Sequence, residues 1–318
     1  MRSPSRNPRF DIVLFDIDNV LVDTRQSYLA AIQKTVEIYL NRPGVVSPKE
    51  IDQFKLLGGF NDDWDCAFGI IAFLETSIQG KPIRFGDHRR YRLSISELAG
   101  LFPERPLEVE GLLKKLRVLY ERVELPSLSK IARIFQRVYL GKNCRGLVQK
   151  EKLIFPKSLL QKIRNGVSGF GIVTGRNRFE ANYALKRFGI KSFFDVLVTI
   201  DEVKRAEKKT GKLLRKPHPW PVLEAARKFS SSGGVTGHPR QKQHGAASNA
   251  SSRLRFLYVG DLPDDILAAK QAAKKISICA AAFPAYARDP DATMKELKKT
   301  HPDFFLKKPQ DLLKILFF

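Results

Sequence analysis

Short apolar runs that alternate with helical stretches constrain the fold of this chain more than any other feature of its sequence. From residue 169 onward such runs have the sequences FGIVT (170–174), DVLVT (195–199), RFLYVGD (255–261) and KISICA (275–280). The segments between them have the spacing of helices, at 178–188, 219–229 and 264–273. This alternation is typical of a parallel sheet covered on both faces by crossover helices. We therefore predict a doubly wound, Rossmann-like α/β core.

The first part of the chain adds one strand and a long helical block. The apolar run FDIVLF at 10–15 predicts a buried strand. From residue 24 to about 165, apolar residues recur every three or four positions, which is typical of helices. We therefore expect residues 1–23 and 166–318 to form the core, with residues 24–165 inserted after its first strand as a large helical domain.

Residues 230–252 differ in composition from the rest of the predicted core. The segment SSSGGVTGHPRQKQHGAASNASS contains no acidic residue and little that could be buried. We interpret it as a disordered, low-complexity loop on the surface of the core.

The net charge of the chain points to anionic partners. The sequence has 56 Lys and Arg against 33 Asp and Glu, a formal charge of +23. Such an excess predicts attraction to polyanions. The basic residues are dispersed, with acids among them, and no zinc finger or RNA-binding aromatic motif accompanies them. We favour a solvated basic surface that steers small anions, and nucleic acid stays an alternative partner.

Other features limit where the chain can act. No apolar run approaches the roughly 18–20 residues of a membrane-spanning helix, so we expect no membrane partner. The first ten residues are basic but lack the apolar segment of a secretory signal. The three cysteines are far apart and form no CxxC pair, which indicates a reducing compartment. We therefore expect a cytoplasmic protein.

Polar residues follow the predicted strands at their carboxyl ends, where open α/β sheets bind ligands. Asp16 and Asp18 end the first strand as a DxD motif. Thr174, Gly175 and Arg176 end another, and they combine a hydroxyl, a residue that permits close backbone approach, and a cation. Either motif alone is a weak signal, because turns commonly contain such residues.

Two further motifs complete an ordered set. Lys216 stands before a proline that precedes a predicted helix, and Asp261 and Asp265 follow the strand FLYV with a spacing of four. Asp264 is an alternative to Asp265, and both also suit the first turn of a helix. Four carboxylates brought together would repel one another unless a cation neutralised them. Mg²⁺, which prefers oxygen ligands, is the natural candidate.

The ordered set resembles the haloacid dehalogenase superfamily, in its branch of magnesium-dependent phosphatases with a helical cap (subfamily I). The segments 10–24, 169–189, 213–224 and 255–274 carry the resemblance. Asn19 departs from the pattern, because the family usually has glycine there, but asparagine tolerates a positive φ. The resemblance implies that residues 24–165 are the cap.

The resemblance also implies roles for individual residues. Asp16 would be the nucleophile that forms an aspartyl-phosphate, and Asp18 would protonate the leaving group and then activate water. Thr174, Gly175, Arg176 and Lys216 would bind the substrate, with Thr174 and Lys216 on the phosphoryl oxygens. Arg176 could contact a second anionic group of the substrate or, equally, pair with an acid on the surface. Mg²⁺ would be held in the group formed by Asp16, Asp18 (through its backbone carbonyl), Asp261 and Asp265, with Asp265 orienting water or Lys216.

The acidic segment GGFNDDWD at 58–65 resembles a little-characterised subgroup of such phosphatases. Its Asp62, Asp63 and Asp65 could contact an amine or sugar hydroxyls of a substrate. The alternative is that they only stabilise the first turn of a helix, where the dipole favours acids.

The function that we predict is Mg²⁺-dependent hydrolysis of a small phosphorylated metabolite. A phosphomutase of the same fold is one alternative, and a phosphatase that acts on nucleic-acid ends is another. A binding protein without catalysis is a further alternative, but the intact motif set argues against it.

Overall fold

The computed structural model describes residues 8–55, 57–60, 62–79, 94–95, 97–98, 107–231, 254–287 and 289–318. The chain divides into two compact units. One, the sheet unit, is formed by Met1–Asp23 with Lys152–Phe318, and the other, the helical unit, by Thr24–Glu151. Each is described by itself.

The sheet unit contains a six-stranded parallel sheet in the order β5-β4-β1-β6-β7-β8. Its strands are β1 (Ile12–Phe15), β4 (Gly169–Val173), β5 (Val196–Val198), β6 (Phe256–Gly260), β7 (Ile278–Ala282) and β8 (Phe304–Phe305). The order confirms the predicted doubly wound α/β class, and all five apolar runs form strands within two or three residues of the predicted positions. A separate two-stranded antiparallel ribbon pairs β2 (Val22–Asp23) with β3 (Lys152–Leu153).

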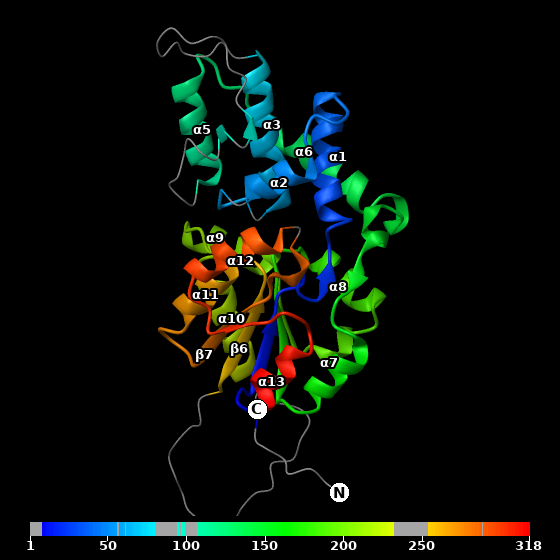
Figure 1. Cartoon of the computed structure of the whole chain (residues 1–318), viewed down its shortest axis with the longest axis vertical. Helices are drawn as coiled ribbons and strands as arrows, with labels where there is room; N and C mark the ends of the chain where they lie inside the picture. The colour runs from blue at the N-terminus through cyan, green and yellow to red at the C-terminus, as the bar shows by residue number, and fades with distance from the viewer. Residues whose placement is uncertain are drawn as a thin grey trace, which may run out of the picture. The chain divides into compact units, whose positions relative to one another are not determined.

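Helices cover both faces of this sheet (Figure 1). Alternate residues of β1 point to opposite sides, as a strand requires. Val13 and Phe15 pack in a core with α7 (Lys157–Arg164), α8 (Arg178–Arg187) and α13 (Asp311–Phe317). Ile12 and Leu14 pack in a second core with α10 (Trp220–Ser231), α11 (Pro263–Ala272) and α12 (Pro290–Lys299). β1 is therefore buried on both faces, which explains its uninterrupted apolar sequence.

Short elements join the strands and helices of the sheet unit. They are α9 (Ile200–Thr210) and the 3₁₀ turns η3 (Lys191–Phe193) and η4 (Pro284–Tyr286). α9 begins with a capping box between Thr199 and Glu202 and ends at Gly211, whose φ of 68° lies in the left-handed region that favours glycine.

The described residues of the helical unit form α1 (Tyr28–Leu40), α2 (Pro48–Lys55), α3 (Asp63–Gln79), α5 (Glu108–Leu119), α6 (Leu128–Tyr139) and the 3₁₀ turns η1 (Lys142–Cys144) and η2 (Leu147–Lys150). α1 packs against both α3 and α6. The ring of Tyr28 stacks on Tyr139, with centroids 4.3 Å apart, and the Tyr139 hydroxyl donates to the buried Glu151 carboxylate (2.9 Å). Ser47 and Glu50 form the capping box that starts α2, through Ser47 N to Glu50 Oε2 (2.7 Å) and Glu50 N to Ser47 Oγ (3.3 Å).

The division between the units differs from the predicted boundary at residue 165. Residues 152–165 belong to the sheet unit, because Leu159, Leu160 and Ile163 of α7 pack in the same core as β1. Their periodicity is that of any amphipathic helix, so the sequence pattern did not distinguish a core helix from an inserted one.

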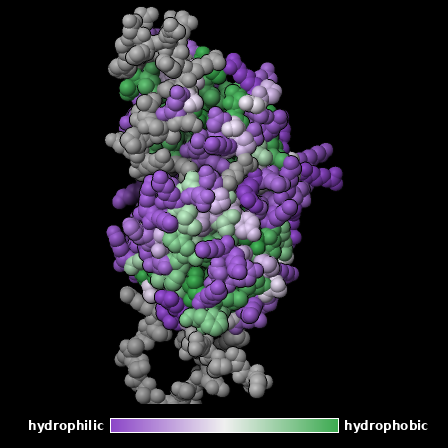
Figure 2. Space-filling model, in the orientation of Figure 1, coloured by the Kyte–Doolittle hydropathy of each residue, from purple (hydrophilic) through white to green (hydrophobic). Residues whose placement is uncertain are grey.

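A predicted feature of the sheet unit falls mostly outside the described residues. The low-complexity segment 230–252 lies there except for Ser230 and Ser231, which end α10. Among the described helices, none combines the length and the apolar character that crossing a membrane would need. Hydrophilic residues cover much of the face shown in Figure 2, among the residues that the structure describes.

Candidate active site

The first motif lies in the turn after β1. The buried Asp16 donates its main-chain amide to the Val259 carbonyl oxygen of β6 (3.0 Å), and the Ile17 amide donates to Asp16 Oδ1 (2.7 Å). Asn19 has a φ of 51°, which supports the expectation that asparagine replaces glycine there in a left-handed turn. Asn19 Nδ2 also donates to Asp261 Oδ2 (3.3 Å). The substitution of the usual glycine therefore adds a hydrogen bond to the site.

The second motif follows β4 and brings Arg176 to Asp18. The Thr174 amide donates to the Val198 carbonyl oxygen (3.0 Å), and Thr174 Oγ1 accepts from the Arg176 amide (3.2 Å). Nε and Nη2 of Arg176 both donate to Asp18 Oδ1, at 2.9 and 2.7 Å, and the Arg176 side chain is only 1% exposed. A Cβ atom at Gly175 would meet nothing within 4 Å. The turn thus leaves space beside Gly175 while Arg176 fixes the Asp18 carboxylate.

Lys216 lies at the centre of a group of oxygen atoms. Its Nζ donates to Asp265 Oδ1 (2.6 Å), to the Tyr258 hydroxyl (2.9 Å) and to the Val173 carbonyl oxygen (3.3 Å). It also forms an ion pair with Asp16 Oδ2 at 3.3 Å. The lysine therefore stands directly beside the first carboxylate of the DxD motif.

The fourth motif follows β6 and opens α11. Asp261 and Asp265 are both buried. Asp265 Oδ2 accepts from the main-chain amides of Asp261 (3.2 Å) and Leu262 (3.1 Å). Its other oxygen accepts from Lys216 and Tyr258. Of the two acids that the sequence left open, Asp265 is the one that joins the cluster, and it is saturated with donors.

Three carboxylates lie close enough to share one cation. Asp16, Asp261 and Asp265 each offer an oxygen within 4.8 Å of the others, and all three are buried. Asp18 does not join this group among the described residues, because Arg176 binds its carboxylate. A hard divalent cation prefers such oxygen donors, so the carboxylates of Asp16 and Asp261, with Asp265 beside them, fit Mg²⁺.

The ionisation of the cluster reflects the shared burial of like charges. Burial raises the pKa of Asp16 to about 7, with Lys216 acting in the opposite direction and the charge of Asp265 adding to the increase. Burial and the charges of Asp265 and Asp16 also hold the pKa of Asp261 well above its ordinary value. Burial acts to lower the pKa of Lys216, but the adjacent Asp16 and Asp265 carboxylates outweigh it and raise that pKa. A bound cation would relieve this repulsion.

Sequence reasoning missed Tyr258, which belongs to the same cluster. Its buried hydroxyl contacts Asp265 Oδ1 (3.0 Å) and the Val173 carbonyl oxygen (3.3 Å) as well as Lys216. A signal was present, because a tyrosine inside the buried run FLYVG must find a partner for its hydroxyl. The residue lies on the strand that leads to Asp261 and so borders the motif.

The acidic residues of the helical unit have other partners. Asp62 Oδ1 accepts from the main-chain amides of Trp64 (2.9 Å) and Asp65 (3.4 Å) at the start of α3. Asp63 forms an ion pair with Lys55 at 2.6 Å. Asp63 and Asp65 both lie in the first turn of the helix. These contacts favour the interpretation that the segment stabilises a helix.

Comparison with known proteins extends over most of the chain. The family model described as haloacid dehalogenase-like hydrolase matches residues 10–273. The matched region contains all four motifs.

Two curated proteins align with the chain at low identity. The pyrophosphatase PpaX of Bacillus pumilus is 26% identical over 310 residues, which cover 96% of this chain and 95% of that protein. The imidazoleglycerol-phosphate dehydratase of Phytophthora nicotianae is 26% identical over 263 residues, 82% of this chain. The chain spans only 41% of the length of that second protein.

A solved structure supports the fold. The phosphatase Tt82 from Thermococcus thioreducens superposes with a TM-score of 0.56 at 22% identity, and the match covers 90% of this chain and 99% of that one.

Proposed function

The chain belongs to the haloacid dehalogenase-like hydrolases, and we propose that it is a phosphatase that hydrolyses small phosphorylated metabolites through an aspartyl-phosphate, with Mg²⁺ bound. The observation that carries the proposal is the buried cluster of Asp16, Asp261 and Asp265 beside Lys216. Buried carboxylates with raised pKa values, next to a lysine at the carboxyl ends of parallel strands, are typical of catalytic sites.

In the proposed first step, a carboxylate oxygen of Asp16 attacks the phosphorus atom and the ester P–O bond breaks. Asp18 gives its proton to the leaving alkoxide. In the second step water attacks the phosphorus atom, Asp18 takes the proton from that water, and the Asp16 carboxylate leaves. The products are the alcohol and inorganic phosphate. Arg176 positions Asp18 for both transfers, because two of its nitrogens bind one oxygen of that carboxylate.

The remaining motif residues would bind the phosphoryl group. Thr174 offers a hydroxyl, and the open space at Gly175 would let phosphoryl oxygens approach the main chain. Lys216 supplies positive charge 3.3 Å from Asp16, where negative charge spreads over the oxygens during transfer. Asp265 and Tyr258 hold Lys216 in this position through hydrogen bonds of 2.6 and 2.9 Å.

Asp16, Asp261 and the backbone carbonyl of Asp18 would hold Mg²⁺. Asp265 would lie outside this set of ligands, because Lys216, Tyr258 and two main-chain amides already occupy its oxygens. When bound, the ion would neutralise the carboxylates and polarise the phosphoryl oxygens.

A phosphoric anhydride is a second candidate substrate class. The relative that aligns with nearly the whole chain is named as a pyrophosphatase, and its alignment covers both units. Lys216 and the cation site would suit the extra charge of such a substrate. A phosphomutase would use the same residues. It would transfer the phosphoryl group from the enzyme back to a sugar, whereas a phosphatase transfers it to water.

The experiment compares phosphate release from an aryl phosphate by the wild type, Asp16→Asn and Asp291→Asn, with Mg²⁺ and with a chelator. Asp291 is an exposed carboxylate in α12 and serves as the matched control. We expect Asp16→Asn to lose activity by about 10³-fold or more, the control to keep it, and the chelator to abolish it. Equal activity of Asp16→Asn and the wild type would refute the proposal.

Substrate class is tested next with pyrophosphate and a panel of phosphorylated metabolites. Release of phosphate identifies a hydrolase, whereas a rearranged sugar phosphate without free phosphate identifies a mutase. We expect the reaction to take place in the cytoplasm, on the basis of three unpaired cysteines, Cys66, Cys144 and Cys279.

A further inference from the structure

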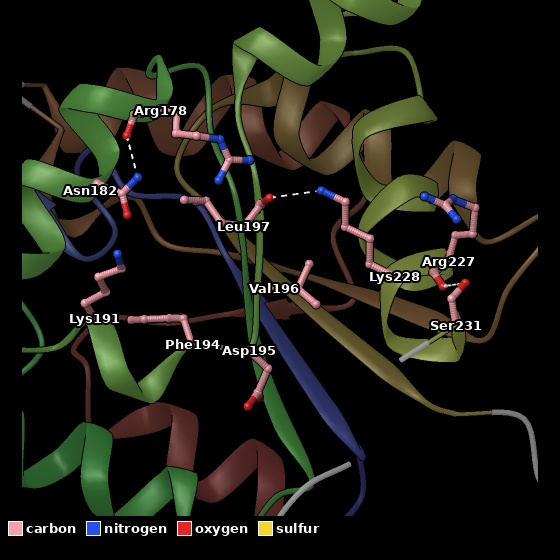
Figure 3. Close-up of a pocket in the computed structure, with 10 residues that line it drawn as sticks. All are labelled: Arg178, Asn182, Lys191, Phe194, Asp195, Val196, Leu197, Arg227, Lys228 and Ser231. Carbon is pink, nitrogen blue, oxygen red and sulfur yellow. Dashed lines mark hydrogen bonds between the residues drawn. The ribbon is translucent and has the colours of Figure 1, made fainter. Parts of the chain in front are cut away.

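The edge of the sheet carries a cavity that none of the proposed catalytic residues lines. It has a volume of about 630 Å³ and lies along β5, between the residues of α8, η3 and α10 (Figure 3). Cavities of several hundred cubic ångströms are the usual size of small-molecule sites. This one belongs entirely to the sheet unit.

Four cationic side chains line the cavity: Arg178, Lys191, Arg227 and Lys228. Arg178 pairs with Glu202, and Arg227 makes two hydrogen bonds to Glu224, each 2.7 Å long. Lys191 is exposed and has no carboxylate within salt-bridge distance among the described residues. Lys228 Nζ donates to the Leu197 carbonyl oxygen at 3.2 Å. The positive charge of this lining exceeds the negative charge that faces it.

The one acidic residue of the lining is occupied elsewhere. Both oxygens of Asp195 accept from Arg164 Nη2, at 3.0 and 3.2 Å, and one also accepts from the Phe170 amide (2.9 Å). Figure 3 shows the Asp195 carboxylate directed away from the ammonium groups of Lys191 and Lys228. It therefore does not neutralise them.

The floor of the cavity is apolar. It is made by Phe194 and Leu197, which pack with the core that contains Phe15, whereas Val196 packs on the opposite face of the sheet with Leu14. The ring of Phe194 contacts Phe15 edge-on (centroids 6.1 Å apart) and also contacts Phe170 (5.7 Å). An inorganic ion would leave this floor uncovered. A ligand that has both an apolar body and negative charges would satisfy the whole cavity.

An added peptide strand fits the same edge less well. β5 is only three residues long, and the Leu197 carbonyl, to which a new strand would have to donate, already accepts from Lys228. Cationic side chains over an apolar floor instead match a small ligand, because lysine and arginine bind phosphate oxygens strongly.

We propose that the cavity formed by β5, α8, η3 and α10 is a binding site for a small organic phosphate with a ring-sized apolar part, separate from the catalytic centre. Lys191 and Lys228 contact the phosphate, and Phe194 and Leu197 contact the apolar part. Part of the basic surface thus binds a specific ligand, in addition to attracting small anions.

The test titrates AMP, as the probe, into the full chain by calorimetry, in an Asp16→Asn background so that AMP is not consumed. K191Q/K228Q should weaken binding about tenfold, the loss of one to two charge-assisted contacts. The matched control K162Q/K298Q removes two exposed lysines outside the cavity and should change nothing. Adenosine and inorganic phosphate should each bind at least tenfold more weakly than AMP.

A second pair of variants does not depend on removing lysines. S231D places a carboxylate in the cavity lining and should weaken binding, whereas S230D adds the same charge at the neighbouring residue outside the lining and should not. Thermal melting by circular dichroism checks folding of all variants.

Three outcomes would overturn the proposal. Equal weakening by both lysine pairs would mean that AMP binds the basic surface in general. Loss of binding in K216Q, with full binding in K191Q/K228Q, would place AMP only in the catalytic centre. Absence of saturable binding would show that the cavity takes no such ligand.

Discussion

Aspartates in the two units have the same chemistry but different surroundings. In the sheet unit, Asp16, Asp261 and Asp265 share one buried volume. In the helical unit, Asp62 accepts main-chain hydrogen bonds and Asp63 pairs with Lys55. The first arrangement is costly without a cation, and the second stabilises the fold by itself. The difference teaches that shared burial of like charges, rather than aspartate content, marks the site.

Asp261→Asn is the most direct test of whether the shared burial of like charges marks the active site. An amide lacks the charge needed to hold a divalent cation, so we expect kcat/KM for an aryl phosphate to fall by about 10²–10³-fold. The same change removes one of the mutually repelling charges, so the free energy of unfolding at pH 8 without divalent cations should rise by about 1 kcal/mol. Urea denaturation and steady-state kinetics measure the two effects. A loss of both activity and stability would mean that Asp261 is structural.

Tyr258→Phe tests whether the cluster depends on the uncharged hydroxyl of Tyr258. Without the hydroxyl, Lys216 and Asp265 lose a hydrogen-bond partner, and we expect kcat to fall about tenfold while KM changes little. Tyr183→Phe, on α8 and outside the cluster, is the control. A change in KM alone would argue that Tyr258 acts on substrate binding instead of positioning Lys216.

Asp62→Ala tests whether the aspartates of the helical unit stabilise the fold and take no part in catalysis. Loss of the hydrogen bonds at the start of α3 should lower the free energy of unfolding by about 1 kcal/mol, with kcat and KM within about twofold of the wild type. Chemical denaturation and kinetics on the same preparation give both values. A raised KM at unchanged stability would instead make the segment part of substrate recognition.

Glu202 sharpens the comparison because it lies in the sheet unit but its carboxylate is held by the Thr199 hydroxyl and amide and by Arg178 and Arg205. Burial raises its pKa, yet hydrogen bonds from Thr199 and Arg178 outweigh that effect and lower the pKa from 4.5 to about 2. A lowered pKa stabilises the fold above pH 4.5, and this stability is lost as the pH falls toward 2. Glu202→Gln should therefore lower stability by about 1 kcal/mol at pH 7 and flatten the decline below pH 4.5. An unchanged pH profile of unfolding would contradict this assignment.

The sheet could be predicted because its signal is local. Five apolar runs of strand length were enough to give the class, and three of the four motifs directly follow their strands in sequence. Asp16 and Asp261 could be named as neighbours because the carboxyl ends of parallel strands meet at one edge of the sheet. Lys216 lies between α9 and α10, and only the family resemblance placed it with them. Asn19 could be interpreted from backbone preference alone, since few residues besides glycine adopt its φ of 51°.

Other features depend on contacts between distant residues and left no local signal. Arg176 binds Asp18, which lies far away in sequence, so the sequence left open whether the arginine contacts a substrate anion or an acid of the protein. The end of the helical insertion was missed because α7 has the same periodicity whichever unit it joins. The cavity on β5 arises from side chains of three separate segments that no pattern connects.

The position of β1 in the sheet has a consequence for synthesis of the chain. Ile12 pairs with Gly169 on one side and with Phe256 on the other, so the strand of this sheet that is synthesised first lies at its centre. Until β6 is made, this apolar strand has at least one open edge, which is a template for aggregation. We expect nascent chains that stop before β6 to bind chaperones and to lack catalysis, because the catalytic centre is completed only with the residues that follow that strand.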